Sequence, residues 1–230
     1  MRLKELLSLK YNPVGIKLHF DESEINKDLT PSKPMAICEA IRVVAMGEWK
    51  IQLSENYISC KGAKAALGFI EPQAIKDMIK TYGKDDEVVE KILKNRPKIE
   101  NIKAITFFPF VKNSSFDILA IIVDAYQILL LNQAFVFQTG ENLTFTMGSN
   151  STLCSYGLAY VFREKIPNLV VPCAGAKIKA CFEDKDALYF IPYEKFENLE
   201  EALSLVLERQ KEKDKFPYIP SSLGDSIKRS

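Results

Sequence analysis

One five-residue pattern, Cys-x-Gly-Ala-Lys, occurs twice in this chain, at residues 60–64 and again at residues 173–177. Each copy follows a segment typical of a strand, and each is followed by a Phe-Ile pair and an amphipathic segment. A further cysteine precedes each copy at a similar distance: Cys38 lies 22 residues before the first, and Cys154 lies 19 residues before the second. Because the features recur in the same order, we expect an internal duplication.

Segments with strand-like and helix-like patterns alternate along the whole chain. Strands are expected at residues 14–20, 48–59, 102–110, 116–123, 143–149 and 168–172, with a hairpin made of residues 177–182 and 187–192. Helices are expected at residues 2–10, 35–47, 72–83, 85–95, 125–137, 154–164 and 197–213. This order favours an α/β or α+β fold.

The duplication suggests how these elements are organised. We expect a single compact domain built from two similar halves, with a mixed sheet and flanking helices. The first half is expected to span residues 1–97 and the second residues 98–210, with residues 211–230 forming a C-terminal tail. Two such halves would pack most simply about a pseudo-twofold axis, which would bring equivalent cysteines to a common cleft.

Composition and charge exclude several classes of protein. Of the 230 residues 47% are hydrophobic and 27% are charged, as in globular proteins. The net charge is only +1, and basic residues alternate with acidic ones, so no basic face for nucleic acid is expected. Apolar runs are interrupted by polar residues and the N-terminal segment does not resemble a secretory signal. We therefore expect a cytoplasmic protein that associates with no membrane.

In a reducing compartment cysteines are expected to be thiols, metal ligands or catalytic groups rather than disulfides. The four duplicated cysteines would suffice for a four-thiolate site holding an iron–sulfur cluster or zinc. The predicted metal ligands are Cys38, Cys60, Cys154 and Cys173. No Cys-x₂-Cys spacing occurs, so the fold alone would have to bring the ligands together. Cys181 has Gly68 at the equivalent position of the first copy and is expected to be structural.

The rest of the repeated pattern suits an anionic group. Glycine permits a tight turn or the close approach of a ligand, and lysine supplies positive charge beside free backbone N–H groups. The predicted cofactor-binding residues are therefore Gly62, Lys64, Gly175 and Lys177. The only histidine, His19, lies in an alternating strand and is expected to be a half-buried strand residue. No motif of a nucleotide-binding loop, serine hydrolase or zinc protease is present.

Dispersed motifs over residues 3–208 resemble the uncharacterised "domain of unknown function 169" family, found mainly in archaea and anaerobic bacteria. They are Pro13-Val14, Cys38 with Gly47-Glu48, Cys60 to Ala63 with Leu67-Gly68, and Pro172 to Lys177. The chain departs from the family by placing proline directly before the second-copy cysteine and by having Lys177 where arginine is common. Lysine would hold an anion only as a point charge. The resemblance implies no known reaction.

Three functions remain open at this point. The first is the binding of a metal or redox cofactor through the duplicated cysteines, by an enzyme or an electron carrier of anaerobic metabolism. The second is a non-catalytic module that holds a small anionic ligand in the pseudo-twofold cleft. The third is an interaction protein whose cysteines only fill the core, as buried cysteines often do. The expected partner is a small molecule or a metal, and a homo-oligomer is compatible with all three.

Overall fold

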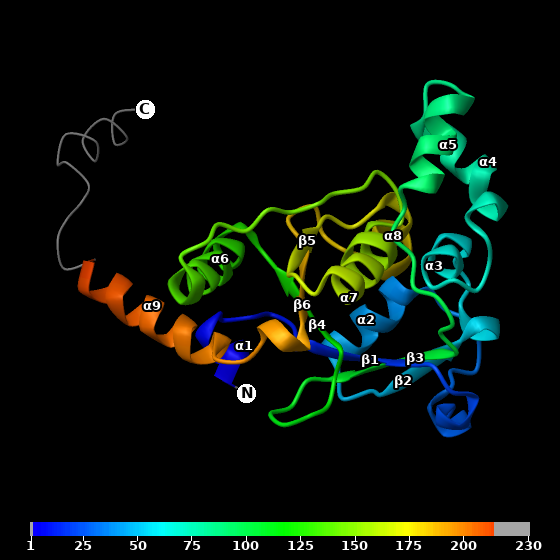
Figure 1. The fold of residues 1–230 in the computed structure, drawn as a ribbon. Coiled ribbons are helices and arrows are strands. Elements are labelled where there is room, and N and C mark those ends of the chain that lie inside the picture. Colours follow the sequence, from blue (N-terminus) through cyan, green and yellow to red (C-terminus); the bar gives the residue numbers. More distant parts are fainter. Residues whose placement is uncertain (1, 214–230) are drawn as a thin grey trace, which may run out of the picture.

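The sequence folds into a six-stranded sheet flanked by helices (Figure 1), and the structure, a computed structural model, describes residues 2–213. The strands are β1 (Val14–His19), β2 (Ile51–Ser54), β3 (Ala104–Pro109), β4 (Ile118–Val123), β5 (Asn168–Val170) and β6 (Ala187–Pro192). The α-helices are α1 (Arg2–Leu6), α2 (Ile37–Met46), α3 (Lys61–Ala66), α4 (Lys76–Ile79), α5 (Asp86–Lys94), α6 (Ala125–Thr139), α7 (Tyr160–Glu164), α8 (Ala174–Ala180) and α9 (Leu199–Lys213).

Shorter helical turns connect these elements. The 3₁₀ turns are η1 (Glu22–Glu24), η2 (Lys27–Leu29), η3 (Glu55–Tyr57), η4 (Pro72–Ile75), η5 (Lys80–Tyr82) and η7 (Tyr193–Lys195). One further segment, η6 (Leu153–Ala159), is a π-helix that continues directly into α7. A π-helical segment is rare and frequently lies at a functional site.

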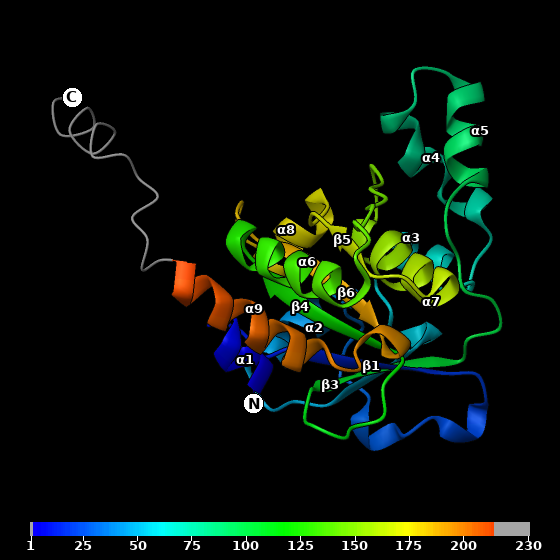
Figure 2. The ribbon, with the colours of Figure 1, turned by 60° about the vertical axis from the view of Figure 1, so that its left-hand side comes forward.

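The strands pair in the order β2-β3-β1-β4-β6-β5, and each pairing between neighbours is antiparallel. The expected single domain of mixed helices and strands is confirmed, although its sheet is antiparallel rather than mixed. Alternation along the strands places residues such as Ile16, Phe107 and Phe190 in a core shared with α2, η6 and α8. The other side of β4 and β6 packs against α1, α6 and α9, which lie apart from α2, α3, α7 and α8 in Figure 1. Figure 2 shows α1 and α9 side by side.

The strand order has the symmetry that two equivalent halves would give. Read inward from its two edges, the sheet presents β2-β3-β1 and β5-β6-β4, so β1 meets β4 at the centre. Gly68 after α3 and Cys181 after α8 both have left-handed backbone, with φ of 71° and 50°. An origin by duplication stays a prediction. If the halves are repeats, the strand order places their boundary between β3 and β4 rather than after residue 97.

Two predicted strands are wrong, for different reasons. Residues 177–182 were expected to form one arm of a hairpin, but α8 covers most of them and Lys177 N donates to Cys173 O at 3.0 Å. Their alternation of lysine with apolar residues imitates a strand, whereas the alanines favour a helix. Residues 143–149 form no strand because the side-chain amide of Asn168 satisfies Thr146, accepting from its N–H and donating to its carbonyl at 2.9 Å each.

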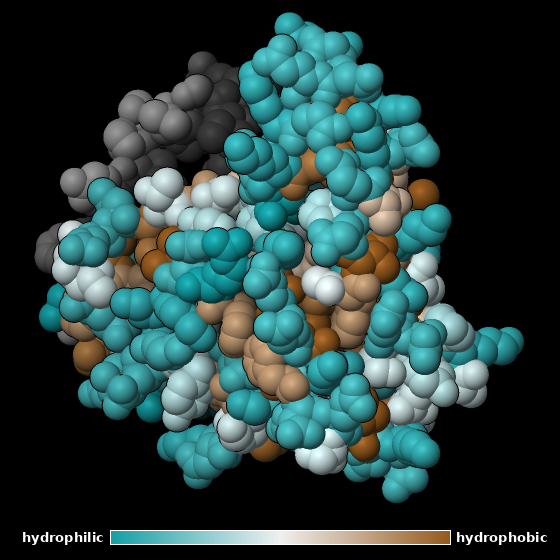
Figure 3. All heavy atoms as spheres, turned by 45° about the vertical axis from the view of Figure 1, so that its right-hand side comes forward, coloured by the Kyte–Doolittle hydropathy of each residue, from teal (hydrophilic) through white to brown (hydrophobic). Residues whose placement is uncertain are grey.

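Helices α4 and α5 form a small lobe that extends from the rest of the domain (Figure 1). Ile75, Ile79, Val89 and Leu93 give this lobe its own apolar core, with Ala65 of α3 at its base. Its outer surface is mostly hydrophilic in Figure 3. The chain returns from the lobe through Arg96 and Pro97, which bring a charged side chain back toward the domain.

The predicted tail begins within α9, and residues 214–230 lie outside the described part of the chain.

Candidate functional site

Four helical segments begin next to one another on the side of the sheet occupied by α2, α3, α7 and α8 (Figure 1). Cys38 is the second residue of α2 and Cys154 is the second residue of η6. Cys60 and Cys173 are the N-cap residues of α3 and α8, and both have extended backbone. We call these four residues the cysteine cluster. Each half therefore contributes one cysteine from a first turn and one from an N-cap.

The cysteine cluster is layered by depth. Cys38 and Cys154 are buried, with 8% and 7% of their surface exposed, and belong to the core beneath the sheet. Cys60 and Cys173 are half-buried and pack against that core from outside. Residues on the N-terminal side thus supply one deep thiol, Cys38, and one shallow thiol, Cys60. Residues on the C-terminal side supply Cys154 and Cys173 in the same way. All five cysteines, including the exposed Cys181, are free thiols.

The four thiols lie close enough to influence one another's ionisation. Burial, with the neighbouring Cys173 and Cys60 acting in the same direction, raises the pKa of Cys38 to about 12. Burial also raises the pKa of Cys154 well above its ordinary value, with Cys60, Cys38 and Cys173 acting in the same direction. Without a bound metal ion the two deep cysteines are neutral thiols, which makes them poor nucleophiles at neutral pH. A bound metal would reverse this, since metals coordinate thiolates.

Arg96 brings a positive charge into the cysteine cluster, and the sequence analysis missed it. Only 7% of its surface is exposed, and burial lowers its pKa while Cys154 and Tyr156 oppose that shift. Its guanidinium donates to Gly62 O at 3.0 Å and to Asn150 Oδ1 at 3.4 Å, while Nε has no hydrogen-bond partner. A buried cation held by neutral acceptors is expected to have an anion beside it.

The loop before η6 closes over α3. A Cβ atom placed on Gly62 would lie 2.1 Å from Ser151 Oγ, so only glycine fits there without a local shift. Ser151 is buried, has a φ of 46°, and donates to Asn150 Oδ1 at 2.6 Å. Gly62 is thus a packing glycine whose carbonyl holds Arg96. This is a different role from the flexible ligand-binding turn that the repeated pattern suggested.

The other predicted cofactor-binding residues are less closely tied to the cysteine cluster. Gly175, the counterpart of Gly62, is exposed and has no neighbouring atom within 4 Å of an added Cβ. Lys177 forms an ion pair with Asp184 beyond the end of α8, so its charge is already partnered. Lys64 is half-buried on α3. The structure therefore favours Arg96 over Lys177 as the cation of this site, and a role for Lys64 stays a prediction.

The arrangement of ligating atoms is looser than that of a formed metal centre. Among residues 2–213, no group of three or more His, Cys, Asp or Glu side chains is arranged to hold a metal ion. The deep and shallow thiols neighbour one another without converging on a point. No electrostatic attraction draws neutral thiols together, whereas a bound metal ion would attract their thiolate forms. What the fold supplies is the gathering of four sulfur donors around a buried cation.

The burial of Cys38 predicts a pH dependence for the stability of the metal-free protein. Its pKa is about 12 in the folded protein and about 8.5 in an unfolded chain. The unfolded chain thus loses its proton first, and the free energy of unfolding falls as the pH rises through this window. The slope is up to about 1.4 kcal/mol per pH unit for one group.

Urea unfolding of the metal-free protein at successive pH values measures this slope. The Cys38→Ala variant should show a shallower fall, and Cys181→Ala, at an exposed position, should follow the wild type. Identical slopes for wild type and Cys38→Ala would contradict the assignment of Cys38 as a buried neutral thiol.

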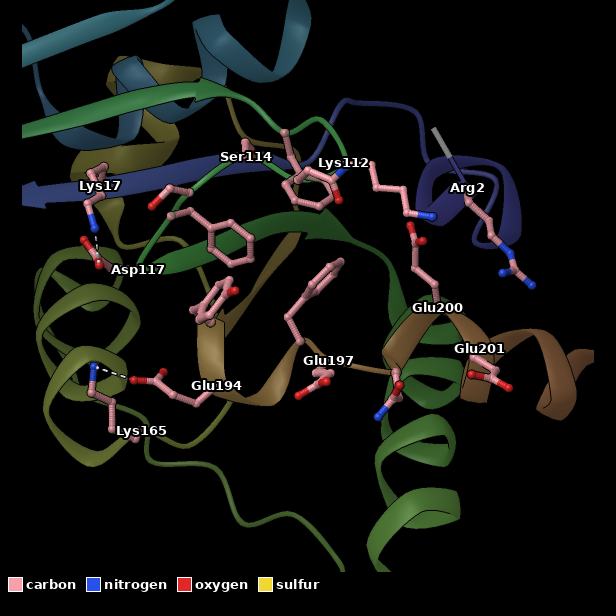
Figure 4. A pocket seen from close by; sticks show the side chains of 17 residues that line it. Arg2, Lys17, Lys112, Ser114, Asp117, Lys165, Glu194, Glu197, Glu200 and Glu201 are labelled. Carbon is pink, nitrogen blue, oxygen red and sulfur yellow. Dashed lines mark hydrogen bonds and ion pairs between the residues drawn. The ribbon is translucent and has the colours of Figure 1, made fainter.

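A cavity of about 720 Å³ lies away from the cysteine cluster, between the β3–β4 connection and the start of α9 (Figure 4). Ion pairs stand at its margin: Lys17 with Asp117 at 2.9 Å and Lys165 with Glu194 at 3.1 Å. Phe110, Phe116, Tyr193 and Phe196 form its aromatic floor. Its charged groups are of both signs, so it favours no one class of ligand.

No helix in the described part of the chain is long and apolar enough to span a membrane.

Comparisons with known proteins agree with the motif-based resemblance. The family model DUF169, described as Uncharacterised ArCR, matches residues 2–202. A protein of Methanocaldococcus jannaschii named "Uncharacterized protein MJ0308" is 26% identical over 211 residues, which cover 88% of this chain and 91% of that protein. No solved structure matches the chain. The matched region includes the whole cysteine cluster and Arg96.

Proposed function

This chain belongs to the DUF169 family, and we propose that its cysteine cluster binds one thiophilic metal centre, either zinc or an iron–sulfur cluster. The observation that carries the proposal is the meeting of four thiols at four helix starts, two from each half, around one buried guanidinium. Four sulfur donors are the usual ligand set of structural zinc and of iron–sulfur clusters.

Charge balance supports a metal centre over a neutral core. Four thiolates around Zn²⁺ carry a net charge of −2, and cysteine-ligated iron–sulfur clusters are also anionic. Arg96 is a buried cation with no carboxylate among its hydrogen-bond partners, and its Nε is free to face such a centre. The negative charge of the metal centre would offset the free-energy cost of burying Arg96, and coordination of the metal would account for the grouping of the thiols.

The binding of a small anion is the second candidate, and the same unpartnered Nε favours it. In that case the ligand would bind to Arg96 rather than to Lys177, which Asp184 already holds. The cysteines would then be core residues, with their thiols neutral. The two proposals share the cation but differ in whether sulfur coordinates a metal.

Elemental analysis of protein purified without oxygen separates them. The metal proposal predicts about one zinc or one iron–sulfur cluster per chain, with a brown colour in the second case. It also predicts that Cys181→Ser has the same metal content as the wild type, because that exposed thiol lies outside the cysteine cluster. Wild-type protein that stays free of metal, including after anaerobic incubation with Zn²⁺ or with iron and sulfide, would reject the metal centre.

Replacing Arg96 by glutamine is expected to weaken metal binding by about 10–100-fold, as changes beside a metal's ligands commonly do. Glutamine can still donate to Gly62 O but carries no charge to balance an anionic centre. Competition with a chromogenic chelator measures the affinity for zinc. Lys177→Gln serves as the matched control and should bind metal like the wild type. Equal affinities for Arg96→Gln and wild type would show that Arg96 does not balance the centre.

A further inference from the structure

One face of the sheet is covered over only half its width. On the side of α1, α6 and α9, strands β4 and β6 present apolar residues such as Leu119 and Tyr189 that pack against those helices. The same face of β1, β2 and β3 presents Lys17, His19, Gln52, Thr106 and Phe108, and they line a cavity of about 470 Å³. This volume is within the range of small-molecule sites. The cavity shares Lys17, Ser114 and Ser115 with the cavity of Figure 4.

A chain of hydrogen bonds crosses the floor of this cavity. Thr106 Oγ1 lies 2.8 Å from His19 Nε2, and His19 Nδ1 lies 3.3 Å from Glu24 Oε1. Gln52 Nε2 donates to Thr106 Oγ1 at 2.9 Å. Gln52 and Thr106 are 2% and 3% exposed. A hydroxyl from β3, an imidazole from β1 and a carboxylate from η1 are thus linked in one chain of hydrogen bonds.

The direction of each hydrogen bond follows from its backbone anchors. Asn26 N donates to Gln52 Oε1 at 2.6 Å, so the amide nitrogen of Gln52 must be the atom that donates to Thr106. Hydrogen bonds from His19 and from Asp21 N lower the pKa of Glu24, so this carboxylate is ionised and only accepts.

Because Glu24 accepts, the tautomer of the His19 ring that fits these contacts carries its proton on Nδ1 and has Nε2 as an acceptor. Only one hydrogen-bond arrangement of the Thr106 hydroxyl then remains. Its oxygen accepts from Gln52 Nε2, and its proton is donated to His19 Nε2. A hydroxyl whose proton points at a base held by a carboxylate is the arrangement of an activated nucleophile.

We propose that Thr106, His19 and Glu24 form a second site that cleaves small acyl esters. Thr106 Oγ1 forms a bond to the acyl carbon and its proton passes to His19 Nε2. The carbon–oxygen bond to the alcohol then breaks, and the alcohol leaves with that proton. A water molecule, deprotonated by His19, releases the acid and restores Thr106. Glu24 is a positioning residue that holds the imidazole, and the ammonium of Lys50 in the same cavity stabilises the oxyanion.

Hydrolysis of p-nitrophenyl acetate and butyrate by the full chain tests this site. Thr106→Val keeps the shape of the side chain but removes the hydroxyl, and it should lower kcat by at least about 100-fold with little change in KM. Thr106→Ser should retain activity because it keeps the hydroxyl. His19→Gln should lose activity as Thr106→Val does, and Thr144→Val, at an exposed position, should match the wild type.

A fluorophosphonate probe locates the nucleophile independently of the thiols. Peptide mass spectrometry of the labelled wild type should find the adduct on Thr106, and circular dichroism should show that each variant is folded. If Thr106→Val does not fold, the comparison of His19→Gln with wild type decides. A wild type that hydrolyses the esters no faster than Thr106→Val or His19→Gln, or an adduct on a residue other than Thr106, would overturn the proposal.

Discussion

Replacing both Cys60 and Cys173 by serine is expected to reduce the metal content from about one equivalent per chain to less than about a tenth. These two residues are the shallow ligands, one from each half, and a serine hydroxyl does not ionise to replace a thiolate at neutral pH. Elemental analysis after anaerobic purification measures the loss.

The controls for this double variant distinguish lost ligands from a lost fold. Cys60 and Cys173 are only half-buried, so the substitutions should leave the melting temperature of the metal-free protein nearly unchanged. Cys181→Ser, which changes the exposed thiol directly after α8, should retain the full metal content. A double variant that binds metal as tightly as the wild type would show that these cysteines are not ligands.

The second large effect is expected at the glycines of the repeated pattern, where the two halves should respond in opposite ways. Gly62→Ala places a Cβ atom 2.1 Å from Ser151 Oγ and 3.1 Å from Met78 Cε, and such overpacking costs about 1–3 kcal/mol. Gly175→Ala adds a methyl group in open space on a helix and should stabilise the protein by up to about 1 kcal/mol. Urea unfolding of both variants measures the difference.

A compensating change tests the cause of the Gly62 effect. Ser151→Gly removes the clashing hydroxyl and suits the left-handed backbone at that position, so it should restore much of the stability of Gly62→Ala. The double variant should also regain the metal affinity that displacement of Arg96 from Gly62 O would reduce. Equal destabilisation by Gly62→Ala and Gly175→Ala would contradict the packing described around η6.

Much of the fold could be predicted because its signals are local. The apolar residues at helical spacing in α2 indicated that helix, and β1 and β4 carry strongly apolar or alternating sequences. The first arm of the predicted hairpin was wrong because period-two alternation in α8 competed with its helix-favouring alanines. The π-helix η6 has no sequence period of its own, so it was expected to be an ordinary helix.

The candidate site could be predicted only in part. Repetition alone pointed to the four cysteines, and the fold brings them together. Arg96 could not be found in this way, because its contacts with Gly62 and Asn150 join segments 34 and 54 residues apart. In the sequence Arg96 lies between a predicted helix and Pro97, and no motif there indicates a functional role. His19 is half-buried on its strand, as expected, but its partners Glu24 and Thr106 were not foreseen.

X-ray absorption spectroscopy at the metal edge tests most directly whether the halves unite in one thiolate site. For the zinc-loaded wild type, four sulfur ligands at about 2.3 Å are expected, and for the iron-loaded protein the sulfur and iron distances of a cluster. The Cys60→Ser and Cys173→Ser variant should show no such shell. A zinc site with nitrogen or oxygen ligands and fewer than three sulfurs would contradict the proposal that Cys38, Cys60, Cys154 and Cys173 share one metal.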